Sequence, residues 1–301
     1  MKMKTIFLIP LLLLTLSLGV FAKLKVVTTL PDLAVLVAAV GKDKVDVFSI
    51  AKGYQDPHFV DPKPSYILKL QSADICFKIG LGLELWLDPL ITGARNAKLQ
   101  IVDCSRGVPI LEVPASVDRS MGDIHAYGNP HIWLDPGNGK IMLDTIAATL
   151  SRKDPANAAF YEANRVSYQM RLDSALAAWQ EKLRPFAGAK VVTYHNSWPY
   201  FSKRFALQVI GYVEPKPGIP PSPSHLNGLA TLMKREGVGL ILMEPYFSEK
   251  DPNLVARLAG AKVLKLASSV GAFKGAEDYL SLFDYNVNLL AGALKGKEGK
   301  P

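Results

Sequence analysis

Three histidines lie where an imidazole could act as a metal ligand. His58 and His131 each directly follow a proline, and His195 directly follows Ala189–Tyr194, a β-branched run typical of a strand. Proline fixes its own φ and restricts the residue before it, so the first two side chains leave the chain in a preset direction. A group held that firmly loses little entropy when it binds a ligand.

Short apolar strands alternating with amphipathic helices must position these histidines. In the first half we expect strands at Leu24–Leu30, Val45–Ile50, Asp74–Ile79 and Leu99–Val102, and helices at Asp32–Val40, Pro64–Gln71 and Leu83–Ile91. In the second half we expect strands at Ala189–Tyr194, Leu207–Val213, Val238–Met243 and Lys262–Leu266, and helices at Ser197–Phe205, Ser224–Arg235, Asp251–Leu258 and Ala276–Leu294. This alternation predicts parallel sheets covered on both faces.

One long helix separates the two halves. It begins at Asp154-Pro155 and continues without interruption to about Arg184, which would span ~45 Å. It is either a surface helix of one domain or a rigid rod between two lobes. The fold class is therefore α/β, with two lobes of roughly four parallel strands each, joined by this helix. The expected limits are 23–153 for the N-terminal lobe, 154–185 for the helix and 186–301 for the C-terminal lobe.

The histidines converge because of where the strands end. In open α/β sheets, ligands bind beyond the carboxyl ends of the strands. His58 lies in the loop after Val45–Ile50, His195 follows its strand, and His131 leads out of the long loop Ser105–Asn129. Each alone could be an ordinary loop histidine, but three imidazoles together would suit a zinc-type ion completed by an oxygen ligand.

The N-terminus predicts export. Lys2 and Lys4 precede the apolar run Ile6–Leu18, and small residues precede Lys23, so residues 1–22 read as a cleavable signal peptide and the protein as periplasmic. Without those two lysines the chain has 33 basic and 27 acidic residues, scattered rather than in blocks. Such a surface does not predict binding of nucleic acid.

Two cysteines, Cys76 and Cys104, are present. In an oxidising compartment a single pair suggests one disulfide. The alternative is two small buried hydrophobic side chains, and their number and spacing do not resemble a zinc–thiolate site.

Several motifs resemble the zinc- and manganese-binding substrate-binding proteins of ABC transporters, the cluster A-I or zinc-uptake-protein-like family. The matching segments, which span essentially the whole chain after residue 22, are Asp56-Pro57-His58, Asn129-Pro130-His131-Ile132-Trp133-Leu134-Asp135-Pro136, Tyr194-His195, Glu214-Pro215, Pro221-Ser222-Pro223-Ser224, Met243-Glu244-Pro245-Tyr246-Phe247 and Tyr285-Asn286. The resemblance implies that His58, His131 and His195 are metal ligands in an inter-lobe cleft. It also implies delivery of the ion to a membrane permease.

The fourth ligand departs from the family. Ala267 stands where the resemblance places an aspartate, and alanine cannot bind a metal. Three alternatives remain: Glu244 at the end of Val238–Met243, a water molecule, or Ser268. We favour Glu244, because a carboxylate at the end of an apolar strand is costly to bury without a partner.

Other polar residues could assist the site. His125, in the long loop, is a candidate accessory residue for capture, although the sequence favours a solvated loop histidine. His225, in the first turn of a helix, reads as structural. Asp56 and Asp135 could orient ring N–H groups, and Asp135 also reads as a helix cap.

The expected function is capture of a divalent transition metal by a monomeric, non-enzymatic importer component. Nitrogen-rich donors favour Zn²⁺ over Mn²⁺, although Mn²⁺ or another divalent metal remains an alternative. An exported zinc hydrolase using the same histidines with Glu244 as base is a second reading. A protein that binds an organic metal chelate is a third, which would require stacking aromatic or cationic side chains.

Overall fold

The structure, a computed structural model, describes residues 23–116 and 125–298. The expected signal peptide, residues 1–22, and part of the long loop Ser105–Asn129 lie outside the described residues. Within the described ranges, none of the helices combines the length and apolar character needed to cross a membrane.

The N-terminal half forms one parallel four-stranded sheet. Its strands are β1 (Leu24–Thr28), β2 (Val45–Ser49), β3 (Ile75–Lys78) and β4 (Gln100–Asp103), in the order β2-β1-β3-β4. The central strand pairs Val26 with Val47 on one side and with Ile75 on the other. Helices α1 (Pro31–Gly41), α2 (Pro64–Gln71) and α3 (Leu87–Ala94) connect the strands, with a 3₁₀ turn at Lys42–Lys44 before β2.

The C-terminal half repeats this arrangement. Strands β5 (Lys190–Thr193), β6 (Gln208–Tyr212), β7 (Leu240–Met243) and β8 (Lys262–Lys265) form a second parallel sheet in the order β6-β5-β7-β8. In both sheets the first strand of the half therefore takes the second place. Helices α6 (Pro199–Arg204), α7 (Pro223–Arg235) and α8 (Lys250–Ala259) lie between the strands. The expected α/β class with two four-stranded parallel sheets is confirmed.

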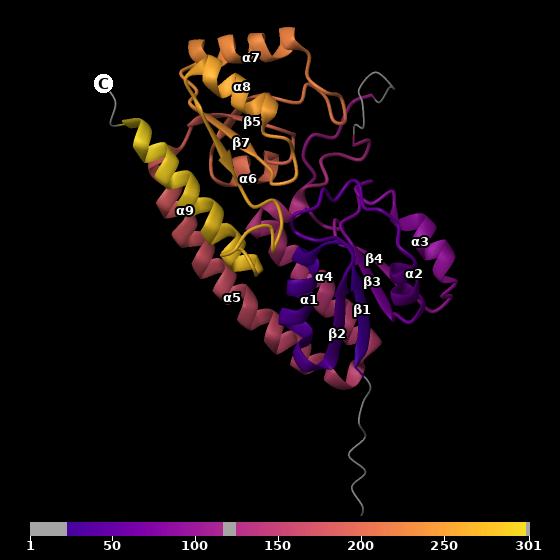
Figure 1. Cartoon of the computed structure of the whole chain (residues 1–301). Helices are drawn as coiled ribbons and strands as arrows, with labels where there is room; N and C mark the ends of the chain where they lie inside the picture. Colours follow the sequence, from indigo (N-terminus) through magenta and orange to yellow (C-terminus); the bar gives the residue numbers. More distant parts are fainter. Residues whose placement is uncertain (1–22, 117–124, 299–301) are drawn as a thin grey trace, which may run out of the picture.

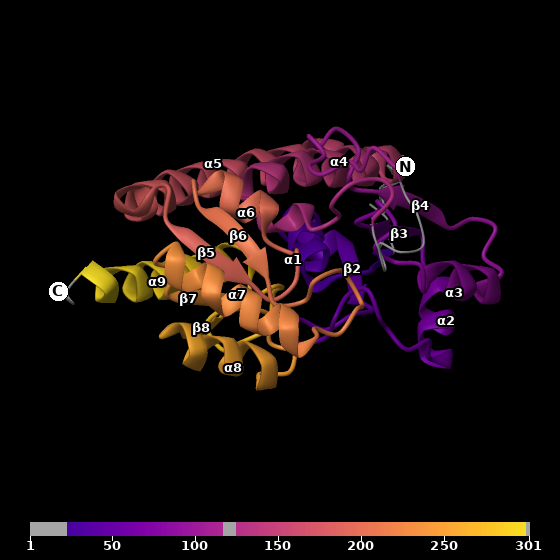
Figure 2. The same cartoon turned by 90° about the horizontal axis from the view of Figure 1, so that it is seen from above.

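Helix α5 joins the two halves, with α4 before it in the chain and α9 beside it. A 3₁₀ turn at Ile132–Leu134 leads into α4 (Pro136–Lys153), and α5 (Ala158–Leu183) runs from one sheet to the other with α9 (Tyr279–Glu298) beside it (Figures 1 and 2). The long helix expected from the sequence is thus confirmed, but its ends differ from the expected ones. Proline near each end accompanies a 3₁₀ turn, at Pro155–Asn157 and Arg184–Phe186, so the α-helix itself has 26 residues.

A single apolar cluster runs through both halves. It contains residues of the first sheet and α1, such as Val26 and Leu33, and residues of the second sheet and α9, such as Leu242 and Phe283. Leu172 of α5 belongs to the same cluster. Smaller clusters cover the other face of each sheet. The two lobes are therefore held by shared packing as well as by one helix.

Cys76 and Cys104 are both free and fully buried, so the expected disulfide between them is absent. Successive strand residues point to opposite faces of a sheet. Cys76 packs with Val27 in the cluster on one face, whereas Cys104 packs with Val26 in the shared core on the other. Burial raises the pKa of the Cys76 thiol to about 12, so the thiolate needed for oxidation is scarce.

A buried carboxyl group also links the lobes. Asp32, in the first turn of α1, accepts hydrogen bonds from the Ser269 hydroxyl and, at 3.2 Å, from the Val270 amide, both of which follow β8. Burial raises the pKa of Asp32 from 3.8 to about 7. The folded state therefore holds this proton more tightly than the unfolded chain does.

We expect two thiols per chain when the purified protein is unfolded in denaturant without reductant. Thiol titration checks this, with the folded protein as the control. The buried thiols of the folded protein should react slowly. Detection of fewer than two thiols after unfolding would contradict the arrangement of the cysteines described above.

We expect the stability contribution of Asp32 to fall as pH rises from about 4 to about 7, because the folded pKa lies above the unfolded one. The slope can reach about 1.4 kcal/mol per pH unit. Asp32→Asn should remove this pH dependence, so the free energy of unfolding of the variant should rise relative to that of the wild type when the pH is raised from 5 to 8. Urea unfolding at pH 5 and at pH 8 measures this difference. Asp46→Asn, at an exposed site on β2, should show no such gain.

Candidate metal centre

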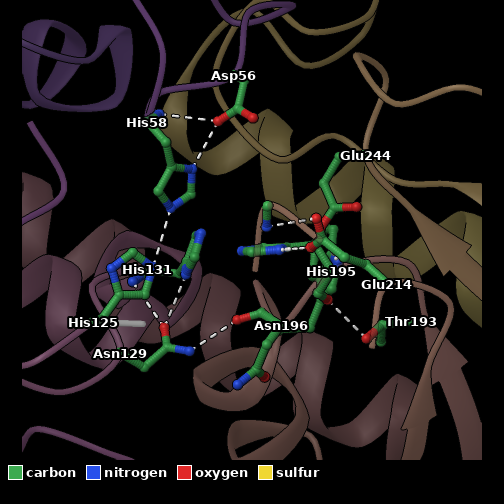
Figure 3. Close-up of polar contacts among 12 residues, drawn as sticks. Asp56, His58, His125, Asn129, His131, Thr193, His195, Asn196, Glu214 and Glu244 are labelled. Atoms are coloured by element: carbon green, nitrogen blue, oxygen red, sulfur yellow. Dashed lines mark hydrogen bonds and ion pairs between the residues drawn. The ribbon is translucent and has the colours of Figure 1, made fainter. Parts of the chain in front are cut away.

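The ends of the strands bring three histidine rings together in the cleft between the sheets. The ring centroids of His58 and His131 are 5.1 Å apart, those of His58 and His195 are 5.4 Å apart, and those of His131 and His195 are 5.5 Å apart. Figure 3 shows the rings turned toward one another. The strand-end rule thus places His58 and His195, whose loops leave β2 and β5.

An oxygen atom holds the Nδ1 side of each ring. His58 Nδ1 lies 2.7 Å from Asp56 Oδ1, His131 Nδ1 lies 2.9 Å from Asn129 Oδ1, and His195 Nδ1 lies 2.5 Å from Glu214 Oε2 (Figure 3). An acceptor at Nδ1 fixes the tautomer in which Nε2 carries the lone pair. Metal-binding histidines are oriented in the same way in other proteins.

Two Nε2 atoms are left without partners. Those of His131 and His195 are buried and have no hydrogen-bond partner among the residues that the structure describes. Burial, followed by the nearby His58 and His195, lowers the pKa of His131 well below its usual value. Burial alone would lower the pKa of His195 too, but the hydrogen bond with Glu214 and the charge of Glu244 raise it. His131 is thus kept neutral, the state in which imidazole binds a metal.

The chain around His131 is stiff. Asn129 Oδ1 accepts from both the backbone N–H and Nδ1 of His131, at 3.0 and 2.9 Å. Asp135 then caps α4 by accepting from the Gly137 amide at 2.8 Å, as the sequence predicts. It also forms two hydrogen bonds, at 2.6 and 2.9 Å, with Arg204 of α6. Asp135 therefore anchors the α4 start to the other lobe instead of orienting a histidine ring.

Glu244 lies at the end of β7 and is completely buried. Its Oε1 accepts from the Trp198 indole at 3.0 Å, while Oε2 has no partner in the described part of the chain. Burial raises the pKa of Glu244 to about 7, and the neighbouring His195 opposes that rise. Figure 3 shows the carboxylate on the His195 side of the cluster.

His125 is part of the cluster as well. Its Nε2 lies 3.2 Å from that of His58, and the two rings stack with centroids 5.1 Å apart. Ligand atoms of His58, His125 and His195 all lie within 4.8 Å of one another. Burial and the neighbouring His58 lower the pKa of His125 to about 3. The structure thus places His125 beside the other rings, whereas the sequence alone favoured a solvated loop residue.

Position 267, where the motif resemblance places an aspartate, is part of the apolar core. Ala267 is buried in the shared core, and Asn286 of α9 clamps its backbone by two hydrogen bonds of 2.8 Å each. The Ser268 carbonyl accepts from the Trp133 indole at 2.8 Å, and its buried hydroxyl has no partner among the described residues. His225 lies outside the cluster, with Nε2 2.9 Å from the Tyr212 carbonyl.

Sequence reasoning missed Glu214 as a partner of His195. A usable signal was present, because Glu214 is the second residue after β6 and its amide donates to the Tyr194 carbonyl at 2.9 Å. The same strand-end rule that places His195 would have placed this carboxylate beside it. For Asn129, neither the loop that it ends nor the motif that contains it indicated a role at His131.

Two cavities open beside the cluster. One of about 460 Å³ is lined by residues that include Glu112, His195 and Glu214, and one of about 620 Å³ by residues that include His58, Phe59 and Tyr127. His125 borders both cavities. Together, the two parallel sheets and the imidazole nitrogens in the cleft between them are the features of a two-lobed metal-binding protein.

Comparison with known proteins gives the family. The profile of the family described as "Zinc-uptake complex component A periplasmic" matches residues 26–293, and the chain belongs to this family. The resemblance inferred from the motifs is thereby confirmed. Proteins of this family are substrate-binding components of metal ABC transporters and not enzymes, so the hydrolase reading is excluded.

Relatives include both manganese and zinc proteins. The manganese ABC transporter substrate-binding lipoprotein PsaA of Streptococcus pneumoniae is 27% identical over 90% of this chain and 89% of its own length. The high-affinity zinc uptake system protein ZnuA of Bacillus subtilis is 25% identical over 90% and 88%. A crystal structure of ZnuA has a TM-score of 0.79 at 28% identity and covers 90% of this chain and 99% of the other. The Mn²⁺ complex of FpvC from Pseudomonas aeruginosa scores 0.78 at 25% identity over 91% and 99%.

Proposed function

We propose that this protein captures Zn²⁺ in the cleft between the two sheets and delivers it to the permease of an ABC importer. One observation carries the proposal: three imidazoles are each fixed at Nδ1 by an oxygen acceptor and turned toward one another. Two of their Nε2 atoms are buried without a partner among the described residues. Leaving buried polar atoms unpaired is costly, and a bound ion would satisfy them.

The donor set favours zinc over manganese. Imidazole nitrogen suits zinc, copper and nickel, whereas carboxylate, carbonyl and water oxygen suit manganese, and Mn²⁺ is the weakest binder in the divalent series. Three histidines with one carboxylate make a nitrogen-rich site. We infer that Mn²⁺ binds much more weakly here than Zn²⁺ does.

For the fourth ligand we infer Glu244. Its Oε2 is buried, unpartnered among the described residues, and close enough to His195 for the two groups to shift each other's pKa. A tetrahedral site of three histidines and one carboxylate agrees with the coordination that zinc prefers. We assign His125 the role of an outer ligand at the cavity mouths, which an arriving ion meets before it reaches His131.

The family and the N-terminal sequence support a proposal for the cellular setting. We infer that residues 1–22 are a cleaved signal peptide, that the remaining chain works as a monomer in the periplasm, and that its partners are a permease and its ATPase. Domain limits near residues 153 and 186 remain our proposal.

One feature favours a second candidate, capture of a metal with an organic chelator. The cavity of about 620 Å³ beside His58 has the aromatic side chains Phe59, Trp86 and Tyr127 in its wall. Phe59 and Tyr127 are 66% and 68% exposed, which is unusual for large apolar groups gathered at one cavity. Mass spectrometry of the native protein separates the two candidates, because a chelator adds organic mass to that of the ion.

We expect about one zinc per chain in protein purified without chelator, and almost none in His131→Ala. Elemental analysis measures the content. His225→Ala is the matched control: it also removes an imidazole, but one that lies outside the cluster, so it should keep its zinc. Equal loss in both variants would mean that metal content follows stability and not the site.

We expect Glu244→Gln and His125→Ala to differ. Glu244→Gln can keep the hydrogen bond from Trp198 but removes a charged ligand, so zinc affinity should fall by about 100-fold or more. His125→Ala should leave affinity within about tenfold and mainly slow zinc uptake. Competition titration and stopped-flow mixing with a chromogenic chelator measure both. The reverse ranking would make His125 the fourth ligand.

A further inference from the structure

Glu112 links the segments that carry two of the candidate ligands, although it does not touch either ring. It lies between β4 and α4, on the wall of the 460 Å³ cavity. Its Oε2 accepts from Asn129 Nδ2 at 3.0 Å and from Asn196 Nδ2 at 2.8 Å. Asn129 precedes Pro130-His131, and Asn196 directly follows His195. One carboxylate oxygen thus contacts both the residue two positions before His131 and the residue directly after His195.

The same contacts determine which way the Asn129 amide faces. Its Nδ2 donates to Glu112 and also, at 2.8 Å, to the Asn196 carbonyl; Figure 3 shows the contact between Asn129 and Asn196. A carboxylate only accepts hydrogen bonds, so the NH₂ group must face Glu112 and the amide oxygen must face His131. That oxygen then requires the proton of His131 on Nδ1 and leaves the Nε2 lone pair toward the cluster.

The surrounding backbone keeps Glu112 in place. Its φ of 55° lies in the left-handed region that residues with side chains adopt sparingly. Tyr200 holds both ends of this loop, because its hydroxyl accepts from the Leu111 amide at 3.1 Å and donates to the Asn129 carbonyl at 2.8 Å. The Asn129 amide in turn donates to the Leu111 carbonyl at 2.9 Å. The hydrogen bonds at Leu111 and Asn129 therefore hold the backbone so that the Glu112 carboxylate faces the two asparagines.

We propose that Glu112 is a positioning residue. Together with the His131 amide and the Asn196 carbonyl it holds the Asn129 amide in the orientation that sets the tautomer of His131, and by bonding Asn196 it keeps the His131 and His195 segments together. For metal binding the inference rests on the proposed function. The tautomer of His131 is a property of the metal-free protein, so the two ideas can fail separately.

The first test compares Glu112→Ala with Glu112→Gln. Both asparagine amides donate to one oxygen, and the single amide oxygen of glutamine can accept both bonds, whereas alanine accepts neither. Long-range ¹H–¹⁵N spectra of ¹⁵N-histidine-labelled, metal-free protein should show His131 as the Nδ1–H tautomer in the wild type and in Glu112→Gln. A mixture of tautomers is expected in Glu112→Ala, together with zinc release about tenfold faster.

A second pair of variants exchanges donor and acceptor. Asn129→Asp places a carboxylate against Glu112 and the Asn196 carbonyl, with no N–H between them, so zinc release should quicken. Combining it with Glu112→Gln restores a donor, from the new glutamine to the new aspartate, and should recover most of the loss. Val113→Ala, at the exposed neighbouring residue, is the control for disturbance of the loop and should match the wild type.

Three results would overturn the proposal. These are a single His131 tautomer in Glu112→Ala, equal behaviour of Glu112→Gln and Glu112→Ala, or no recovery in the double variant. If the wild type binds no zinc while the tautomer still responds to Glu112, the proposed function fails and the positioning role of Glu112 stands.

Discussion

The apolar core that runs from one sheet to the other is the constraint on which the rest of the molecule depends. It is reinforced by polar contacts across the same boundary, such as the Trp133 indole to the Ser268 carbonyl at 2.8 Å and the Tyr279 hydroxyl to the Trp133 carbonyl at 2.7 Å. A boundary packed this way cannot open widely without exposing apolar surface to water. The cleft and its ring cluster are therefore largely formed before any ion arrives.

The electrostatics of such a preformed site favour holding an ion, although a transport protein must also release it. The buried nitrogens and Glu244 Oε2 are unsatisfied among the described residues, so an ion gains much by binding them. Asp56, Asn129 and Glu214 already order the rings through their contacts with Nδ1, so little further entropy would be lost on binding. Since the shared core resists wide opening, we infer that release acts on the contacts at the cavity mouths, where His125 and the loop segment with Glu112 lie.

Much of the fold follows from hydrophobic periodicity, but the contacts within the site do not. Apolar runs such as Val238–Met243 predicted every strand within a few residues, and the strand-end rule placed His58 and His195 near each other. The order of strands and the core shared between lobes depend on tertiary packing, which no local pattern records. The disulfide expectation failed because strand alternation puts Cys76 and Cys104 on opposite faces. His125 was underrated because only the folded loop brings it within 3.2 Å of His58.

The balance of nitrogen and oxygen donors bears on which ion the proposed site would prefer. Glu244 is fully buried, whereas Ala267, at the position where the motif resemblance places an aspartate, carries no ligand atom. The proposed site would therefore have one carboxylate among several imidazoles. Such a site would lack the set of oxygen ligands that manganese prefers and would keep the nitrogen donors that bind zinc well. Since the relatives include both manganese and zinc proteins, the proposal of zinc depends on this balance of donors and not on the family.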